Sequence, residues 1–167
     1  MKPETRRGAM LAFQPPRGTL EGLIAPAEKA AEGAHERIRT LVADDSPVCR
    51  RAALLLLAKL PQVEMVGAAE DGVDVLALVA STRPDLVLMD LQMPRLDGLQ
   101  ATRKIRAEFP CVRVIMTTFN DSEESKAASV ASGVDRFIRK ECLRDELPGA
   151  VAQLFSGRAG GAEGARP

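Results

Sequence analysis

A short apolar run that ends on an acid constrains the fold more than any other stretch of this sequence. Residues Leu86–Met89 lead directly into Asp90, and Pro84 and Pro94 bound the segment. A continuous apolar run between such breakers is typical of a strand that is buried on both faces of a parallel sheet. The carboxyl ends of parallel strands face the ligand crevice of an open α/β sheet, so we expect Asp90 at the functional edge. Taken alone, the acid is equally well explained as a cap of the following turn.

Four other segments also have the character of strands, and a helical segment follows each of the five. Ser46 before Pro47 marks a helix start, and Pro61, Pro84 and Pro110 each stop a helix. The predicted strands span 38–43, 63–68, 86–90, 112–116 and 134–138, and the predicted helices span 47–60, 73–83, 99–108, 121–133 and 144–155. This alternation predicts the α/β class: a doubly wound, five-stranded parallel sheet in the order 2-1-3-4-5, with helices on both faces.

The spacing of apolar residues gives each predicted helix an expected buried side. The residues that share one side are Val48, Ala52, Leu55 and Leu56 in the first helix, Val73, Leu76, Ala77 and Ala80 in the second, Thr102, Ile105 and Phe109 in the third, and Leu147, Val151 and Leu154 in the fifth. The fourth helix offers chiefly Val130 as a large apolar anchor. We also expect the charges of Asp135 and Arg136 to alter the surface that the fourth helix, the fifth strand and the fifth helix form together.

The composition excludes several classes of function. The chain has 23 basic and 23 acidic residues, and its aromatic content is 3%, so we expect neither nucleic-acid binding nor attraction to an anionic membrane. His35 is the only histidine, which argues against chemistry that needs several histidines. Cys49, Cys111 and Cys142 are odd in number and widely spaced, which indicates reduced thiols in a cytoplasmic protein. No apolar stretch approaches the ~20 residues of a membrane span.

The globular pattern covers only part of the chain. We predict a domain over 37–156. Residues 1–36 are rich in Pro, Gly and Ala without sustained periodicity, which predicts a largely disordered N-terminal extension. The Gly-rich residues 157–167 are predicted to form a flexible tail.

Polar residues that suit phosphoryl transfer stand at the predicted strand ends. The first strand ends on Asp44 and Asp45, the third on Asp90, the fourth on Thr117 and Thr118, and the fifth on Lys140. Three close carboxylates repel one another unless cations relieve them, and Mg²⁺ with oxygen ligands together with the ammonium of Lys140 would do so. A carboxylate nucleophile, a metal ion, a lysine and a hydroxyl at one point form a site for phosphoryl transfer to Asp90.

These segments together resemble the receiver domain of two-component response regulators. The matching pieces are Leu41–Pro47, Asp85–Pro94 with Asp97–Gly98 after it, Val114–Phe119 and Phe137–Lys140. The resemblance extends over 38–155 and implies a flavodoxin-like receiver fold. The segments are most similar to receivers that carry a C-terminal helix-turn-helix domain.

The resemblance also implies a phosphorylated aspartate and a bound Mg²⁺. Asp90 would accept the phosphoryl group from a sensor histidine kinase or a His-containing phosphotransfer protein. The implied metal ligands are Asp45, Asp90, the backbone carbonyl of Gln92 and, through water, Asp44. The implied phosphate-responsive residues are Lys140, which pairs with the phosphate, Thr117, which carries the switch hydroxyl, and Phe137, the aromatic that turns inward. Such a domain is an enzyme only in catalysing its own phosphorylation and dephosphorylation.

Few residues follow the last predicted helix, so we expect a stand-alone receiver that signals through its own surface. The usual surface is the fourth helix, fifth strand and fifth helix, which a downstream protein would bind; a homodimer through it is left open. The alternatives are a phosphorylation-independent interaction module, a phosphate sink, and a DNA-binding regulator that lost its effector domain. A phosphatase of the haloacid dehalogenase type is rejected, because it needs a second acid where Gln92 stands.

Overall fold

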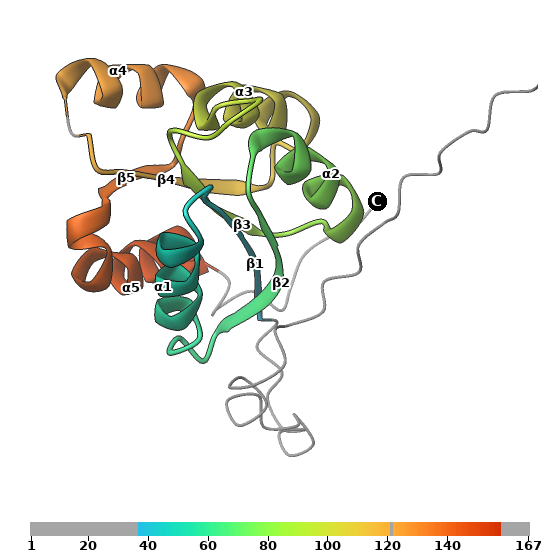
Figure 1. Ribbon diagram of the computed structural model, residues 1–167. Coiled ribbons are helices and arrows are strands. Elements are labelled where there is room, and N and C mark those ends of the chain that lie inside the picture. Colours follow the sequence, from blue (N-terminus) through green and yellow to red (C-terminus); the bar gives the residue numbers. More distant parts are fainter. Residues whose placement is uncertain (1–36, 121, 158–167) are drawn as a thin grey trace, which may run out of the picture. The chain divides into compact units, whose positions relative to one another are not determined.

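A parallel sheet flanked by helices on both faces makes up the part of the chain described by the computed structural model, residues 37–120 and 122–157 (Figure 1). Its strands are β1 (Ile38–Ala43), β2 (Val63–Ala69), β3 (Leu86–Asp90), β4 (Arg113–Thr118) and β5 (Arg136–Arg139). Its helices are α1 (Pro47–Leu57), α2 (Gly72–Thr82), α3 (Gly98–Glu108), α4 (Glu123–Ser132) and α5 (Leu143–Leu154), and a short 3-10 helix, η1 (Lys140–Cys142), precedes α5. The strand order β2-β1-β3-β4-β5 confirms the predicted topology. The predicted extension over 1–36 and nearly all of the predicted tail lie outside the described residues.

Polar side chains begin four of the helices. Ser46, Asp71, Asp97 and Ser122 each accept a hydrogen bond from a backbone N–H in the first turn of the helix that follows. Such N-caps satisfy donors that the helix itself leaves without a partner. All four helices follow strands that end at the same edge of the parallel sheet, so the caps also fix where the loops at that edge run.

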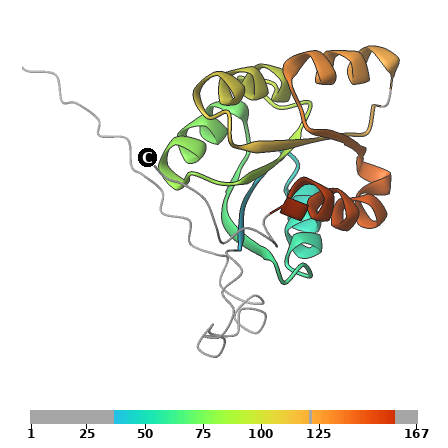
Figure 2. The same ribbon diagram turned by 180° about the vertical axis from the view of Figure 1, so that it is seen from behind.

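Two apolar layers enclose the sheet. Under α2 and α3 the core includes Leu41, Val87, Met89, Val114 and Met116, and under α1 and α5 it includes Val42, Leu86, Leu88, Ile115 and Ile138. Alternate residues of β1, β3 and β4 therefore point to opposite faces, as strands buried on both sides require. Figure 2 shows α1 and α5 together on one face, with α2, α3 and α4 on the other.

The buried side of α1 differs from the expected one. Val48 is 77% exposed and Leu55 is 41% exposed, whereas Ala53 and Leu57 are buried against the sheet. The four consecutive leucines Leu54–Leu57 surround the helix, so apolar spacing fits more than one side. Contact with β1 and β2 decides which side is buried, and it leaves Val48 and Leu55 exposed.

The same ambiguity affects α2. Val73, predicted to face inward, is 46% exposed, and the fully buried residues are Val75 and Val79. Nearly every residue of this helix is apolar or small, so the sequence pattern carries little directional information. The predicted sides of α3 and α5 are confirmed by the burial of Thr102, Ile105, Leu147 and Val151.

Helix α4 packs through small polar residues, so the prediction that Val130 anchors it is wrong. Val130 is 72% exposed, and the buried residues of α4 are Ser129 and Ser132. The Ser129 hydroxyl donates to the carbonyl of Ser125 at 2.7 Å, and that of Ser132 donates to the carbonyl of Ser129 at 2.7 Å. These bonds satisfy the serines within the helix and leave little apolar contact with the domain.

Asp135 immediately precedes β5 and, although expected to alter the surface of the fourth helix, fifth strand and fifth helix, its side chain is only 10% exposed and is paired within the domain. Its carboxylate pairs with Arg106 of α3 and with Arg113, the latter at 2.9 Å, and accepts the N–H of Val114 at 2.7 Å. Arg106 also donates to the carbonyl of Gly133 at 2.6 Å. The acid therefore ties α3 and the end of α4 to the amino-terminal edge of the sheet.

Among the described residues, no helix is long and apolar enough to cross a membrane.

Candidate functional site

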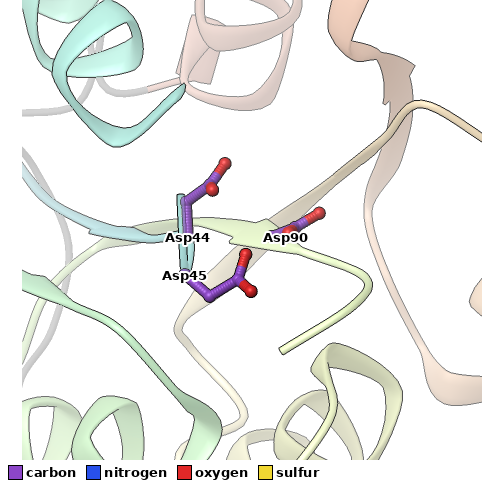
Figure 3. A group of neighbouring side chains, drawn as sticks. All are labelled: Asp44, Asp45 and Asp90. Atoms are coloured by element: carbon purple, nitrogen blue, oxygen red, sulfur yellow. The ribbon is translucent and has the colours of Figure 1, made fainter. Parts of the chain in front are cut away.

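Three carboxylates meet at the carboxyl-terminal edge of the sheet. Asp44 and Asp45 follow β1, and Asp90 ends β3, its neighbour in the sheet (Figure 3). One oxygen of each lies within 4.8 Å of the others. Asp44 and Asp90 are each 4% exposed, whereas Asp45 is exposed to solvent. The acids converge as predicted, because the parallel strands that carry them end at the same edge of the sheet.

Lys140 bridges two of the acids. Its ammonium nitrogen lies 2.7 Å from Oδ2 of Asp44 and 3.1 Å from Oδ1 of Asp90. The lysine follows β5 directly and extends along the sheet edge to reach the end of β3. The same nitrogen lies 5.2 Å from the centroid of the Phe119 ring, within range of a cation–π contact. One buried cation is thus shared between two buried carboxylates.

Burial and neighbouring charges set the protonation of this pair. Burial raises the pKa of Asp90 to about 6; the charge and hydrogen bond of Lys140 oppose the rise, and the charge of Asp44 adds to it. Burial lowers the pKa of Lys140, but its bonds and charge interactions with Asp44 and Asp90 outweigh that effect and raise it above its usual value. The lysine therefore stays charged, while Asp90 titrates near neutral pH.

The loop after Asp90 is held close to its own strand by Gly98. The Gly98 N–H donates to the carbonyl of Leu91 at 3.0 Å, and a β-carbon at this position would lie 2.1 Å from the carbonyl oxygen of Asp90. Only glycine allows this approach, so Gly98 fixes the path of the residues that line the site. A turn at Asp97–Gly98 was predicted, but the close approach of Gly98 to the Asp90 carbonyl was not.

Thr117 lies beside Asp90 on β4, in register with it. Its hydroxyl donates to the carbonyl of Met89 at 3.3 Å, and the residue is buried. A cavity of about 270 Å³ at the site is lined by Asp45, Ser46, Cys49, Asp90, Gln92, Thr118, Phe119 and Lys140. Thr117 is not among these lining residues, and its hydroxyl is turned toward the backbone of β3. Thr118, predicted with Thr117 at the end of the fourth strand, does line the cavity, whereas Phe119 was not predicted there.

Phe137 and Gln92 occupy different surroundings. Phe137 on β5 is half-buried and packs against the core under α2 and α3. Gln92 lines the cavity, and its backbone lies near enough to the Asp90 carboxylate to lower the pKa of that acid. The structure thus brings five of the predicted residues together: Asp44, Asp45, Asp90, Gln92 and Lys140. Thr117 lies next to Asp90 on β4, and Phe137 lies on β5, the strand beside β4.

This donor set fits a hard divalent cation. All side-chain donors are carboxylate oxygens, and one of them, on Asp45, is open to solvent so that bound water can be retained. Oxygen donors with retained water suit Mg²⁺, whereas softer metals favour nitrogen or sulfur. Asp45 and Asp90 would hold the ion at the cavity, with the buried Asp44 behind them.

Comparison with known families places the chain in one class. The sequence matches the response regulator receiver domain over residues 40–152. The protein therefore belongs to the receiver domain family of two-component response regulators. Its doubly wound sheet and its cluster of strand-end acids agree with that assignment.

Individual relatives extend beyond the matched region. YxjL of Bacillus subtilis, an uncharacterized transcriptional regulatory protein, is 32% identical over 124 residues, which cover 74% of this chain and 57% of the relative. The response regulator GacA of Pseudomonas aeruginosa is 32% identical over 121 residues, 72% of this chain and 56% of the relative. A protein-glutamate methylesterase/protein-glutamine glutaminase of Myxococcus xanthus is 38% identical over 107 residues, 64% of this chain and 30% of the relative. The chain thus spans between roughly a third and just over half of these proteins, and the similarity concerns their receiver portion.

Solved structures show the same fold. The signal receiver domain of the response regulator NarL from Mycobacterium tuberculosis matches with a TM-score of 0.69 and 30% identity, over 73% of this chain and 98% of that one. The response regulator domain of CheB from Thermotoga maritima matches with a TM-score of 0.65 and 26% identity, over 75% and 98% of the two chains. The receiver domains of two different response regulators thus share this architecture.

Proposed function

We propose that this receiver accepts a phosphoryl group on Asp90 from the phosphohistidine of a sensor kinase or a phosphotransfer protein, with Mg²⁺ as cofactor. One observation carries the proposal: Lys140 bridges Asp44 and Asp90 while Asp45 completes a cluster of oxygens within 4.8 Å. Phosphoryl transfer needs an acceptor oxygen between fixed positive charges. Aspartyl phosphorylation and Mg²⁺ are typical of this family, which supports assigning both to these residues.

The chemistry follows from the roles of the three groups. An oxygen of the ionised Asp90 forms a bond to phosphorus while the N–P bond of the donor histidine breaks and its electron pair returns to the imidazole. Lys140 stays charged beside the acceptor and pairs with the phosphoryl oxygens. Mg²⁺, when bound by Asp45 and Asp90, supplies further positive charge against those oxygens.

The response to phosphorylation is proposed to pass through Thr117 and Phe137 to the surface of α4, β5 and α5. The Thr117 hydroxyl bonds to a backbone carbonyl at 3.3 Å, a weak contact that a phosphoryl oxygen on the adjacent Asp90 would replace. Phe137 is half-buried and has room to change its exposure. Helix α4 exposes Val130 and buries only serines, so its position changes at small cost. A downstream protein would bind this altered surface.

Intact-protein mass after incubation with acetyl phosphate tests the acceptor. We expect a gain of one phosphoryl group that requires Mg²⁺ and is absent in Asp90→Asn. Asp145→Asn, which removes an exposed acid of α5, serves as the matched control and should be phosphorylated like the wild type. Phosphorylation that persists in Asp90→Asn would mean that another residue is the acceptor. Phosphorylation that is independent of Mg²⁺ would contradict the proposed metal site.

A further inference from the structure

Two arginines meet neighbouring acids at the corner between β2 and α2, which we call the acidic corner (Glu70 and Asp71). Arg50 of α1 reaches Oε1 of Glu70 at 2.7 Å. Arg95, from the loop after β3, donates through Nε to Oδ2 of Asp71 at 2.7 Å. The corner belongs to neither of the loops that carry the predicted metal ligands, yet one arginine joins it to each of them.

Arg50 connects the acidic corner to the loop after β1. Its Nη1 donates at 2.6 Å to the carbonyl oxygen of Asp44, which belongs to the peptide that joins Asp44 to Asp45. The Arg50 side chain is 16% exposed, so it is largely enclosed by the protein. The guanidinium therefore holds the backbone between two of the three clustered acids.

Arg95 connects the acidic corner to the loop after Asp90. Its backbone has a φ of 63°, in the left-handed region that residues with a β-carbon rarely adopt. Such a conformation persists only where surrounding contacts fix it. Here the side chain pairs with Asp71 and, at 2.9 Å, with Asp74, while the carbonyl of Leu96 accepts the N–H of Gly72 at 3.1 Å.

Asp71 is itself held in place. Its side chain is 8% exposed, and Oδ1 accepts the N–H groups of Val73 at 2.8 Å and Asp74 at 3.0 Å. Burial raises the pKa of Asp71, but these backbone bonds and Arg95 outweigh that effect and lower it, so the acid stays ionised. The loop after β3 is thus attached to the fixed first turn of a helix.

We propose that Arg50, Glu70, Asp71 and Arg95 are positioning residues for the metal site: they hold the two ligand-bearing loops at the separation that Mg²⁺ requires. This inference rests on the proposed function, because it assumes that the site binds Mg²⁺. The clustered carboxylates repel one another before the ion arrives, and the two arginine links oppose the resulting spread of the loops. None of the four is among the residues that line the cavity at the site.

A purely structural role would make a different prediction. Loss of a structural ion pair lowers thermal stability and leaves the metal affinity of the folded protein unchanged. Loss of a positioning contact weakens metal binding even in a protein that remains fully folded. The two roles are therefore separated by measuring Mg²⁺ binding directly, without any phosphodonor.

The experiment titrates the full chain with Mg²⁺ in a calorimeter and records the melting temperature of the same samples. The variants are Asp71→Asn and Arg95→Gly; the second removes the guanidinium, relaxes the positive φ and leaves the cap of α2 intact. We expect each to weaken Mg²⁺ binding by about 10-fold, the lower end of what outer-shell partners of metal ligands contribute. Arg95→Lys, which keeps the charge but not the fork of donors, should lie between Arg95→Gly and the wild type.

The matched control is Asp135→Asn. Asp135 is also a nearly buried acid, 10% exposed, that pairs with two arginines, but it lies at the other end of the strands. We expect a lower melting temperature and an Mg²⁺ affinity within about twofold of wild type, because groups at opposite ends of the strands act independently. Equal weakening in this control would overturn the inference and indicate a general effect of stability.

The remaining outcomes separate the inference from the proposed function. A wild type that shows no Mg²⁺ binding would overturn the proposed function, and the inference with it. Wild-type binding combined with unchanged affinity in Asp71→Asn and Arg95→Gly would overturn the inference alone. If Asp71→Asn fails to fold, Arg95→Gly decides, because the helix cap does not depend on it.

Discussion

At the scale of single residues, Asp90 and Lys140 show how one buried ion pair serves a reactive site. A carboxylate buried beside another acid resists ionisation, and the ammonium 3.1 Å away opposes that tendency without cancelling it. The pKa of Asp90 near 6 therefore means that the metal-free acid carries its charge at an energetic cost above that pH. A cation bound there, as proposed, would remove this cost.

Replacing Asp90 with Asn should raise the stability of the metal-free protein at pH 8. The folded-state pKa of Asp90 is raised from 3.8 to about 6. The contribution of Asp90 to the free energy of unfolding is fully present below pH 3.8. It is lost as the pH rises through about 6, because the buried carboxyl must then ionise in the folded protein. Asparagine has no such loss, so the variant should be more stable than wild type by about 2–3 kcal/mol at pH 8, and this difference should shrink toward pH 4. Urea unfolding in the presence of a chelator at both pH values measures it. A difference that does not vary with pH would show that burial of the charge is not its cause.

At the scale of elements, the strand ends were predictable and the buried sides of two helices were not. Parallel strands deliver their last residues to one edge, so the positions of Asp44, Asp90 and Lys140 follow from the order of segments alone. The helices α1 and α2 are apolar on more than one side, so their orientation depends on tertiary contacts that periodicity does not contain. The acidic corner was also missed, because Arg50 and Arg95 reach acids 20 and 24 residues away and spacing gives no sign of such contacts.

Substitutions in α1 test which side of the helix is buried. Leu57 is fully buried and Leu55 is 41% exposed, although they are only two residues apart. Leu57→Ala should lower the free energy of unfolding by about 2–5 kcal/mol, because it leaves a cavity in the core. Leu55→Ala should lower it by less than about 1 kcal/mol. Chemical denaturation of both variants measures the difference, and equal losses would contradict the observed orientation.

Helix α4 should be the least protected helix of the described domain. It buries Ser129 and Ser132, whereas α5 buries Leu143, Leu147, Ala150 and Val151. With little apolar area to lose on opening, α4 should exchange its amide hydrogens at least about 10-fold faster than α5. Hydrogen-exchange mass spectrometry on peptides from the two helices measures this ratio. Protection of α4 equal to that of α5 would argue against a helix that moves at small cost.

At the scale of the whole molecule, the two edges of the sheet are stabilised in different ways. At the amino-terminal edge, Asp135 is matched by Arg106 and Arg113, so its charge is paired. At the carboxyl-terminal edge, three acids cluster and Lys140 pairs with only two of them, which leaves a negative excess. An edge with an excess of negative charge is less stable alone and would gain from a bound cation. Mg²⁺ bound as proposed would therefore stabilise the fold.

That coupling should depend on pH in a way that identifies Asp90 as a ligand. Protons and Mg²⁺ compete for the same carboxylate, and the metal-free pKa of Asp90 is about 6. The apparent affinity for Mg²⁺ should therefore change little between pH 8 and 7 and become about 10-fold weaker near pH 5. The Mg²⁺-induced rise in melting temperature should fall over the same range. In Asp90→Asn the affinity should be weaker and should lose this step near pH 6. Calorimetric titration at three pH values measures the trend, and a wild-type affinity that is constant from pH 8 to 5 would exclude Asp90 from the metal site.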